Sequence, residues 1–185
     1  MDNGACSYRR FLDGDDCGIA EIVKAYKDGL ILYLNGYVKN IHIAEDLTED
    51  TFFRLITKKP RFSGKSTFKS WLYAIGRNIA VDYVRRNSRI VGTPLSDMEN
   101  YLCEEATLEQ AYIRDERKIM IHKAISELRP DCQNILWLVF FEGFTNGEAA
   151  IILRKNNRQI KNLLYRSKQS LKLKLEEGGF IYEEL

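Results

Sequence analysis

The sequence contains no long hydrophobic run. Its longest unbroken apolar segment is the seven residues from Ile135 to Phe141, whereas a helix that crosses a bilayer needs about 20. The first residues, Met1 to Gly4, also lack the basic and then apolar layout of a secretory signal. We therefore expect no membrane insertion and a cytoplasmic location.

Metal-ligand patterns and catalytic motifs are missing as well. The four cysteines are far apart and form no Cys-x-x-Cys pair, which argues against a zinc site or a disulfide scaffold. Residues 64–67 imitate the end of a phosphate-binding P-loop, but Lys59 stands where that motif requires glycine, and no strand precedes it. Because no nucleophile lies beside a plausible base, we expect no enzyme activity, no metal and no cofactor.

Charge is segregated along the chain, although the net charge is only +2. Residues 54–90 carry 10 basic and 1 acidic side chains, and residues 154–174 carry 8 basic and none acidic. Residues 91–117 carry 2 basic and 7 acidic side chains. Two separate basic blocks predict two contacts with a polyanion such as nucleic acid. The alternative for either block alone is a solvated helix face.

Strand signals are nearly absent and apolar residues recur at helical spacing, which predicts an all-α protein. A first helix is expected to follow the acidic cluster at residues 13–16 and to run to about Lys39, and a second to begin near Ala44. One arc of this second helix would face a core; it holds Ala44, Leu47, Thr48, Thr51, Phe52 and Leu55.

The opposite side of the second helix presents three carboxylates and an aromatic ring: Asp46, Glu49, Asp50 and Phe53. An aromatic side chain among acids on an outer face indicates a protein-binding surface. The alternative is an ordinary soluble helix.

A basic loop, residues 58–66, interrupts the helical pattern, and a third helix follows from Ser66 or Thr67 to about Arg86. Its expected inner face holds Phe68, Trp71, Leu72, Ile75 and Ile79, and its expected outer face holds Lys69, Tyr73 and Arg77. Aromatic rings among cations suit single-stranded nucleic acid, since unstacked bases lie on the rings while the phosphates are neutralised. Core packing is the alternative for Phe62, Trp71 and Tyr73.

The acidic residues 91–117 contain Gly92 and Pro94, and we expect a flexible linker there between two small helical domains, residues 1–90 and 118–185. In the second domain, Thr145 and Glu148 match the S/T-x-x-E capping box. A short helix to Leu153, a tight turn and a longer basic helix over about 157–175 describe a helix-turn-helix.

The longer helix carries polar side chains away from its apolar positions: Arg158, Gln159, Lys161, Asn162, Tyr165, Arg166 and Lys168. Arginine, glutamine and asparagine near a helix N-terminus can make bidentate contacts with base edges in the major groove. Lysines further along suit phosphates, which position a protein without reading sequence. A basic surface helix is the alternative.

Two blocks of the chain resemble a known family. Residues 44–55 (AEDLTEDTFFRL) and 68–82 (FKSWLYAIGRNIAVD) resemble region 2 of a bacterial RNA polymerase sigma factor. Residues 128–168, from Leu128-Arg129-Pro130 onward, resemble region 4. The most similar type is the small extracytoplasmic-function (ECF) sigma factor, which keeps only these two regions.

The resemblance implies a protein that binds core RNA polymerase and directs it to promoter DNA, with an anti-sigma factor as a further partner. It implies that Asp46, Glu49, Asp50 and Phe53 dock on the coiled coil of the largest polymerase subunit. It implies that the minus-ten element is opened and its non-template strand held by Arg61, Phe62, Ser63, Lys65, Tyr73, Arg77 and Asn78. The minus-thirty-five element would be read by the polar side chains of the helix from Asn157.

Several positions depart from the family pattern. Arg154 and Lys155, in the turn, stand where glycine and an aliphatic residue are usual; a left-handed backbone at Arg154 would cost about 1 kcal/mol. Leu163 replaces a frequent basic residue and Gln159 a frequent threonine. The alternative function is a conventional helix-turn-helix regulator that does not associate with polymerase.

Overall fold

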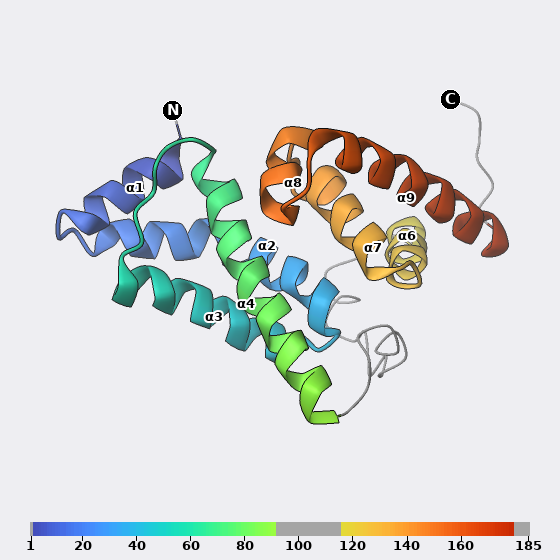
Figure 1. Ribbon diagram of the computed structural model, residues 1–185, viewed down its shortest axis with the longest axis horizontal. Helices are drawn as coiled ribbons and strands as arrows, with labels where there is room; N and C mark the ends of the chain where they lie inside the picture. Colours follow the sequence, from blue (N-terminus) through green and yellow to red (C-terminus); the bar gives the residue numbers. More distant parts are fainter. Residues whose placement is uncertain (1, 92–115, 180–185) are drawn as a thin grey trace.

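The computed structural model describes residues 2–91 and 116–179, and every regular element in these two ranges is a helix. The first domain consists of α1 (Asn3–Leu12), α2 (Cys17–Val38), α3 (Ile41–Lys58) and α4 (Phe68–Val91). The second contains α6 (Glu116–Ser126), α7 (Pro130–Leu136), the π-helical turn η2 (Trp137–Phe141), α8 (Asn146–Leu153) and α9 (Asn157–Glu177). The all-α prediction is confirmed (Figure 1). The predicted linker lies almost wholly outside the described residues. Among the described residues, no helix is long and apolar enough to cross a membrane.

Helix α1 was not predicted from the sequence pattern. Asp2 begins it by accepting a hydrogen bond from the Ala5 amide at 3.2 Å, and the same carboxylate accepts one from the Phe68 amide at 2.5 Å. A Cβ atom on Gly18 would lie 2.2 Å from the Ser7 carbonyl oxygen, so only glycine lets α2 approach α1 this closely.

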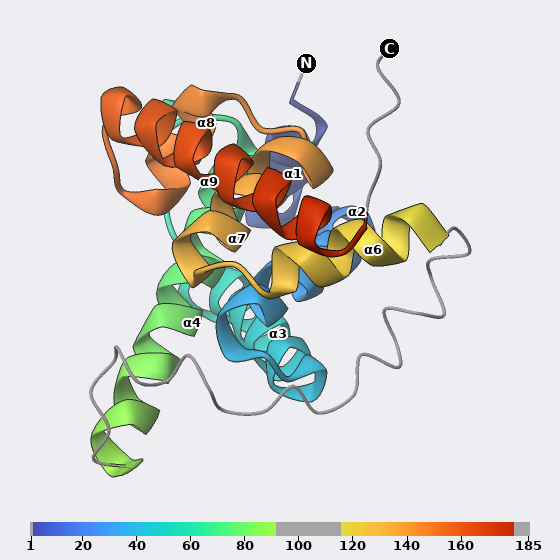
Figure 2. The same ribbon diagram turned by 90° about the vertical axis from the view of Figure 1, so that its right-hand side faces the viewer.

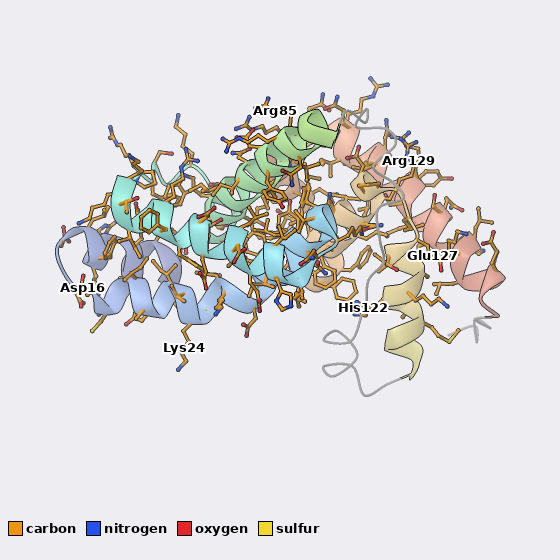
Figure 3. The ribbon with its side chains drawn as sticks, turned by 90° about the horizontal axis from the view of Figure 1, so that it is seen from below. Asp16, Lys24, Arg85, His122, Glu127 and Arg129 are labelled. Atoms are coloured by element: carbon orange, nitrogen blue, oxygen red, sulfur yellow. The ribbon has the colours of Figure 1, made fainter. Side chains whose placement is uncertain are left out.

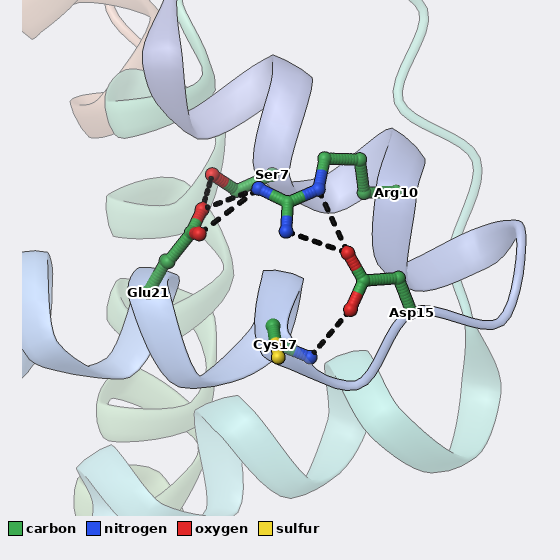
Figure 4. A network of polar contacts seen from close by, with 5 residues as sticks. All are labelled: Ser7, Arg10, Asp15, Cys17 and Glu21. Atoms are coloured by element: carbon green, nitrogen blue, oxygen red, sulfur yellow. Dashed lines mark hydrogen bonds and ion pairs between the residues drawn. The ribbon is translucent and has the colours of Figure 1, made fainter.

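Polar contacts join α1 to the start of α2 (Figure 4). Arg10 donates to Asp15 and to Glu21, with the shortest N–O distances at 2.5 and 2.9 Å, and Ser7 donates to Glu21 at 2.6 Å. The hydrogen bond from Arg10 lowers the pKa of Asp15, and the bonds from Ser7 and Arg10 lower that of Glu21. Both carboxylates are therefore charged partners that hold the short turn between the helices.

Helix α3 has the two faces that the sequence predicts. It begins at Ile41 rather than near Ala44, because Asn40 caps it by accepting from the Ile43 amide at 3.2 Å. All six residues of the predicted inner arc are buried. The hydroxyls of Thr48 and Thr51 are satisfied by the carbonyls of Ala44 and Leu47, each at 2.8 Å. Burial of this arc fixes which side of α3 faces outward.

An aromatic cluster anchors the basic loop to the first domain. The rings of Tyr8, Phe62, Phe68 and Trp71 lie with neighbouring centroids 5.2–5.7 Å apart. The Tyr8 hydroxyl also donates to the Pro60 carbonyl at 2.8 Å. The loop before α4 is therefore held at both the backbone and the side-chain level.

The second domain follows its predicted caps. Pro130 opens α7, and Gly143 takes a left-handed φ of 71° between η2 and α8. Both halves of the capping box formed by Thr145 and Glu148 are present. On α6, His122 (Figure 3) lies at the edge of the core, its ring centroid 4.9 Å from that of Phe141 and 5.7 Å from that of Trp137.

The two domains pack directly against each other, α4 against α8 and α2 against α7 (Figures 1 and 2). Their buried side chains form one continuous hydrophobic cluster. This packing overturns the expectation that Lys69, Tyr73 and Arg77 face outward, since Tyr73 is only 1% exposed and the other two are half-buried. Figure 2 shows the C-terminal end of α4 extending away from the body of the molecule.

Candidate nucleic-acid and protein interfaces

The outer face of α3 presents Asp46, Glu49, Asp50 and Phe53 together, and all four are exposed. Phe53 exposes 64% of its surface, an unusual position for a phenylalanine. Because the opposite arc of the helix is buried, these side chains cannot turn inward without dismantling the core. The result is a fixed acidic surface with one aromatic ring, suited to contact with another protein.

The basic loop exposes Arg61, Ser63 and Lys65. Phe62 beside them is half-buried, with its ring in edge contact with Phe68 at 5.7 Å and tilted against Trp71 at 5.2 Å. Gly64 takes φ 71° with open space around its Cα, so the loop turns there through a left-handed backbone. The loop thus presents cations and a partly accessible ring at one place.

The α4 residues predicted to act with this loop are less accessible than the loop itself. Tyr73 is enclosed by Tyr33 and by Phe144 of the second domain, with ring centroids 5.3 and 5.1 Å away. Burial, together with the nearby carboxylate of Glu142, raises its pKa far above the usual tyrosine value. Arg77 and Asn78 are half-buried, and the Nε atom of Arg77 is buried without a hydrogen-bond partner among the described residues. The loop and the helix positions are therefore not presented on one open surface.

Helix α9 presents all seven polar side chains predicted from the sequence, each of them exposed. Tyr165 exposes 66% of its surface. Ile160, Leu163, Ser167 and Leu175 are buried and hold the helix in its domain. Leu163, which replaces a basic residue usual in the family, is thus a packing residue here.

Gln159 and Lys168 have partners within the domain. The Gln159 side chain accepts from the Asn156 amide at 2.9 Å, and Asn156 accepts from the Gln159 amide at 2.8 Å, a second capping box that begins α9. The Lys168 ammonium lies 5.2 Å above the Phe140 ring. In the turn before α9, Arg154 has a left-handed backbone with φ 53°. Glycine, which is usual at this position in the family, adopts that backbone without a steric penalty.

Two features of the second domain were not predicted. Glu142 and Glu148 contact the start of α4, and nothing in the local sequence pattern signals a partner some 70 residues away. A largely apolar groove also lies between α6, α7, η2 and α9, lined by Ile121, Ile125, Leu136, Phe140, Phe141, Leu171 and the charged Lys168. The run of apolar residues 135–141 was the only signal for it.

The fold and these surfaces define a two-domain helical protein with an exposed acidic face on α3, a basic loop and a separate helix-turn-helix. Two family models match the chain, Sigma-70 region 2 over residues 22–90 and Sigma-70 region 4 over residues 118–171. The ECF RNA polymerase sigma factor SigM of Bacillus subtilis is 29% identical over 160 residues, which cover 86% of this chain and 96% of SigM. SigX of the same organism is 26% identical over 155 residues, covering 82% and 80%.

A solved structure has the same fold. It is the sigma factor RpoE in complex with the anti-sigma factor NepR from Bartonella quintana, with a TM-score of 0.68 and 22% identity over 85% of this chain and 96% of that chain. The present chain therefore belongs to the RNA polymerase sigma factors of the ECF type. It is a transcription initiation factor that binds core RNA polymerase and directs promoter recognition, as the resemblance implied.

Proposed function

We propose that this sigma factor docks on core RNA polymerase through Asp46, Glu49, Asp50 and Phe53 of α3. The observation that carries this assignment is an exposed phenylalanine among three exposed carboxylates on a helix whose opposite face is buried. Aromatic anchors dominate many protein interfaces, while surrounding charges steer association and select the partner.

Charge reversal tests this docking surface. Asp46→Lys combined with Asp50→Lys should lower the affinity for core polymerase by about tenfold or more, because two attractive contacts become repulsive. A matched control, Asp28→Lys with Glu177→Lys, changes two exposed acids on other helices and should leave the affinity within about twofold. Fluorescence anisotropy measures the affinity of each variant for core polymerase. If both double variants bound polymerase as tightly as the wild type, the assignment of this surface would be wrong.

The proposal for the minus-ten element rests on the basic loop and α4. Arg61, Ser63 and Lys65 would neutralise phosphates of the non-template strand, and Phe62 would support an unstacked base. Tyr73, Arg77 and Asn78 would extend this surface along α4. The exposed cations of the loop support the first half of this assignment. The second half requires Tyr73 to become accessible, because its ring is buried against Phe144 of the second domain.

For the minus-thirty-five element, α9 supplies the reading surface. Arg158, Gln159, Asn162 and Arg166 are the donors suited to base edges, and Lys161, Lys168 and Tyr165 are suited to phosphates and sugars. Their shared exposure on a helix held by Ile160 and Leu163 supports this assignment.

We extend the proposal to organisation and partners. Residues 1–90 form the polymerase-binding and minus-ten domain, residues 91–117 the linker, and residues 118–185 the minus-thirty-five domain. The protein acts in the cytoplasm, where polymerase and promoters are. An anti-sigma factor controls it, an assignment supported by the complex of the similar sigma factor RpoE with NepR. Purification of a tagged chain from its host would recover both polymerase and such an inhibitor.

A further inference from the structure

Helix α1 packs against the beginning of the basic loop. The Lys59 ammonium, just after the end of α3, lies 4.9 Å from the centroid of the Phe11 ring. About one turn earlier on α1, the Tyr8 hydroxyl donates to the Pro60 carbonyl at 2.8 Å. Tyr8 and Phe11 are only 1% and 5% exposed. Burial raises the pKa of Tyr8 to about 12, so its hydroxyl keeps at neutral pH the proton that it donates.

The start of α1 holds the other end of the loop. Asp2 accepts from the Ala5 amide at 3.2 Å through Oδ1 and from the Phe68 amide at 2.5 Å through Oδ2. One carboxylate therefore caps both α1 and α4, whose first amides have no partner within their own helices, and it faces the positive ends of both dipoles. Thr67, the residue before α4, satisfies the Ser70 amide at 3.3 Å. The cap on Phe68 is thus supplied by α1 and not by the neighbouring sequence of α4.

Close packing holds α1 on the rings beneath the loop. A Cβ on Gly4 would lie 2.6 Å from Cδ1 of Phe68, so glycine lets the first turn of α1 rest on that ring. The Tyr8 ring centroid lies 5.4 Å from those of Phe68 and Trp71. Phe62, the aromatic residue of the loop, rests on the same two rings, with centroids 5.7 and 5.2 Å away. Helix α1 therefore supports Phe62 through Phe68 and Trp71.

The side chains proposed to meet DNA lie between these two anchored ends. The segment that joins α3 to α4 runs past α1 in the opposite direction (Figure 1). Along it, Arg61, Ser63 and Lys65 are exposed, and they make no hydrogen bond or ion pair within the described part of the chain. Fixing the ends of so short a segment restricts the conformations between them. The conformation of the loop is therefore set by its contacts with α1 and by Phe62.

We propose that α1 pre-organises the basic loop for the non-template strand of the promoter, with Asp2 and Tyr8 as positioning residues. The inference rests on the proposed function, since it concerns the loop assigned to the minus-ten element. Ordering a loop on binding costs conformational entropy, and a loop already held in shape avoids that cost. Asp2 and Tyr8 act through the backbone of Phe68 and Pro60. A helix that only stabilised the domain would instead affect all of its parts together.

Two double variants of the full chain separate these roles. The anchor variant, Asp2→Ala with Tyr8→Phe, removes the carboxylate and the hydroxyl that hold the loop and keeps the aromatic ring at position 8. The control variant, Asp13→Ala with Tyr83→Phe, removes the same two kinds of group where neither makes a side-chain hydrogen bond among the described residues.

Limited proteolysis with trypsin measures the loop without DNA. Trypsin cleaves after Arg61 and Lys65, and the exposed Lys24 and Lys27 of α2 serve as reference sites. Because cleavage requires local opening of the backbone, loop cleavage in the anchor variant should be about tenfold faster than in the wild type and the control variant. Cleavage in α2 should not change, whereas a general loss of stability would accelerate all four sites together. Mass spectrometry of the fragments identifies each site.

Binding of a fluorescent dT12 single strand measures the consequence for DNA. A loop variant, Arg61→Ala with Lys65→Ala, removes the two cations and should lower the affinity for dT12 about tenfold. The anchor variant keeps both cations and should lower this affinity roughly fivefold, because its loop must be ordered on binding. The affinity of the anchor variant for core polymerase should stay within about twofold of the wild type.

The outcomes distinguish this inference from the proposed function. Equal loop cleavage in the anchor and control variants, or equal acceleration at the α2 sites, overturns the positioning role of α1. Selective loop cleavage without a loss of affinity for dT12 also overturns it, because the conformation of the loop then does not matter for binding. A loop variant that binds dT12 like the wild type shows instead that the loop is wrongly assigned to the minus-ten element. A weakened loop variant beside an unchanged anchor variant leaves that assignment standing and removes only the role of α1.

Discussion

At the scale of single residues, Arg154 is one of three non-glycine residues with a positive φ in the described part of the chain, together with Lys39 and Lys59. It ends α8 with φ 53°, a region that glycine enters without a steric penalty. Arg154→Gly should therefore raise the free energy of unfolding by about 1 kcal/mol. Urea denaturation checks this value.

The neighbouring residue supplies the control for that substitution. Lys155 is not among the described residues with a positive φ, so Lys155→Gly should lower the free energy of unfolding by roughly 0.5–1 kcal/mol. If Arg154→Gly destabilised the protein to the same extent, the left-handed strain would not exist.

Arg158 and Lys161 test the reading surface of α9. Alanine at either position should reduce transcription from minus-thirty-five-dependent promoters about tenfold, since one base or phosphate contact contributes roughly 1–3 kcal/mol. Affinity for core polymerase should not change. Lys172→Ala, an exposed lysine further along the same helix, serves as the matched variant in multiple-round transcription. Loss of polymerase binding in Arg158→Ala would mean that α9 is a protein interface.

At the scale of the element, α9 depends on its N-terminal capping box. Asn156→Ala removes the acceptor for the Gln159 amide and should lower the free energy of unfolding by about 1 kcal/mol. The adjacent, exposed Asn157 makes no capping bond, and Asn157→Ala should change stability by less than about 0.5 kcal/mol. Thermal unfolding followed by circular dichroism compares the two, and equal effects would show that the box contributes nothing.

At the scale of the whole molecule, the chain by itself cannot open a promoter. Opening about ten base pairs costs on the order of 14 kcal/mol at ~1.4 kcal/mol per step. Two or three bases stacked on protein rings return roughly 2–9 kcal/mol. We therefore expect permanganate-reactive thymines only when core polymerase is present. A reactive bubble with the purified chain would show that the protein has further melting surfaces.

The sequence alone determined the features that depend on neighbours within one helix. The two faces of α3 follow from helical periodicity, and the capping box of Thr145 and Glu148 follows from a four-residue pattern. The exposed polar face of α9 also follows from helical periodicity. Helix α1 escaped prediction because its position depends on α2 and on Asp2, which also contacts α4.

Only the tertiary structure decided what covers each apolar face. Helix α4 is buried along more than one stripe, with Phe68 packed against Tyr8 and Tyr26 of its own domain and Tyr73 packed against Phe144 of the other. Periodicity identifies such residues as apolar or amphipathic but not their partners, because the hydrogen bonds between the domains join positions 69 to 94 residues apart. Glu148 illustrates the limit: its bond to Thr145 is local and predictable, whereas its bond to Thr67 exists only because the two domains meet.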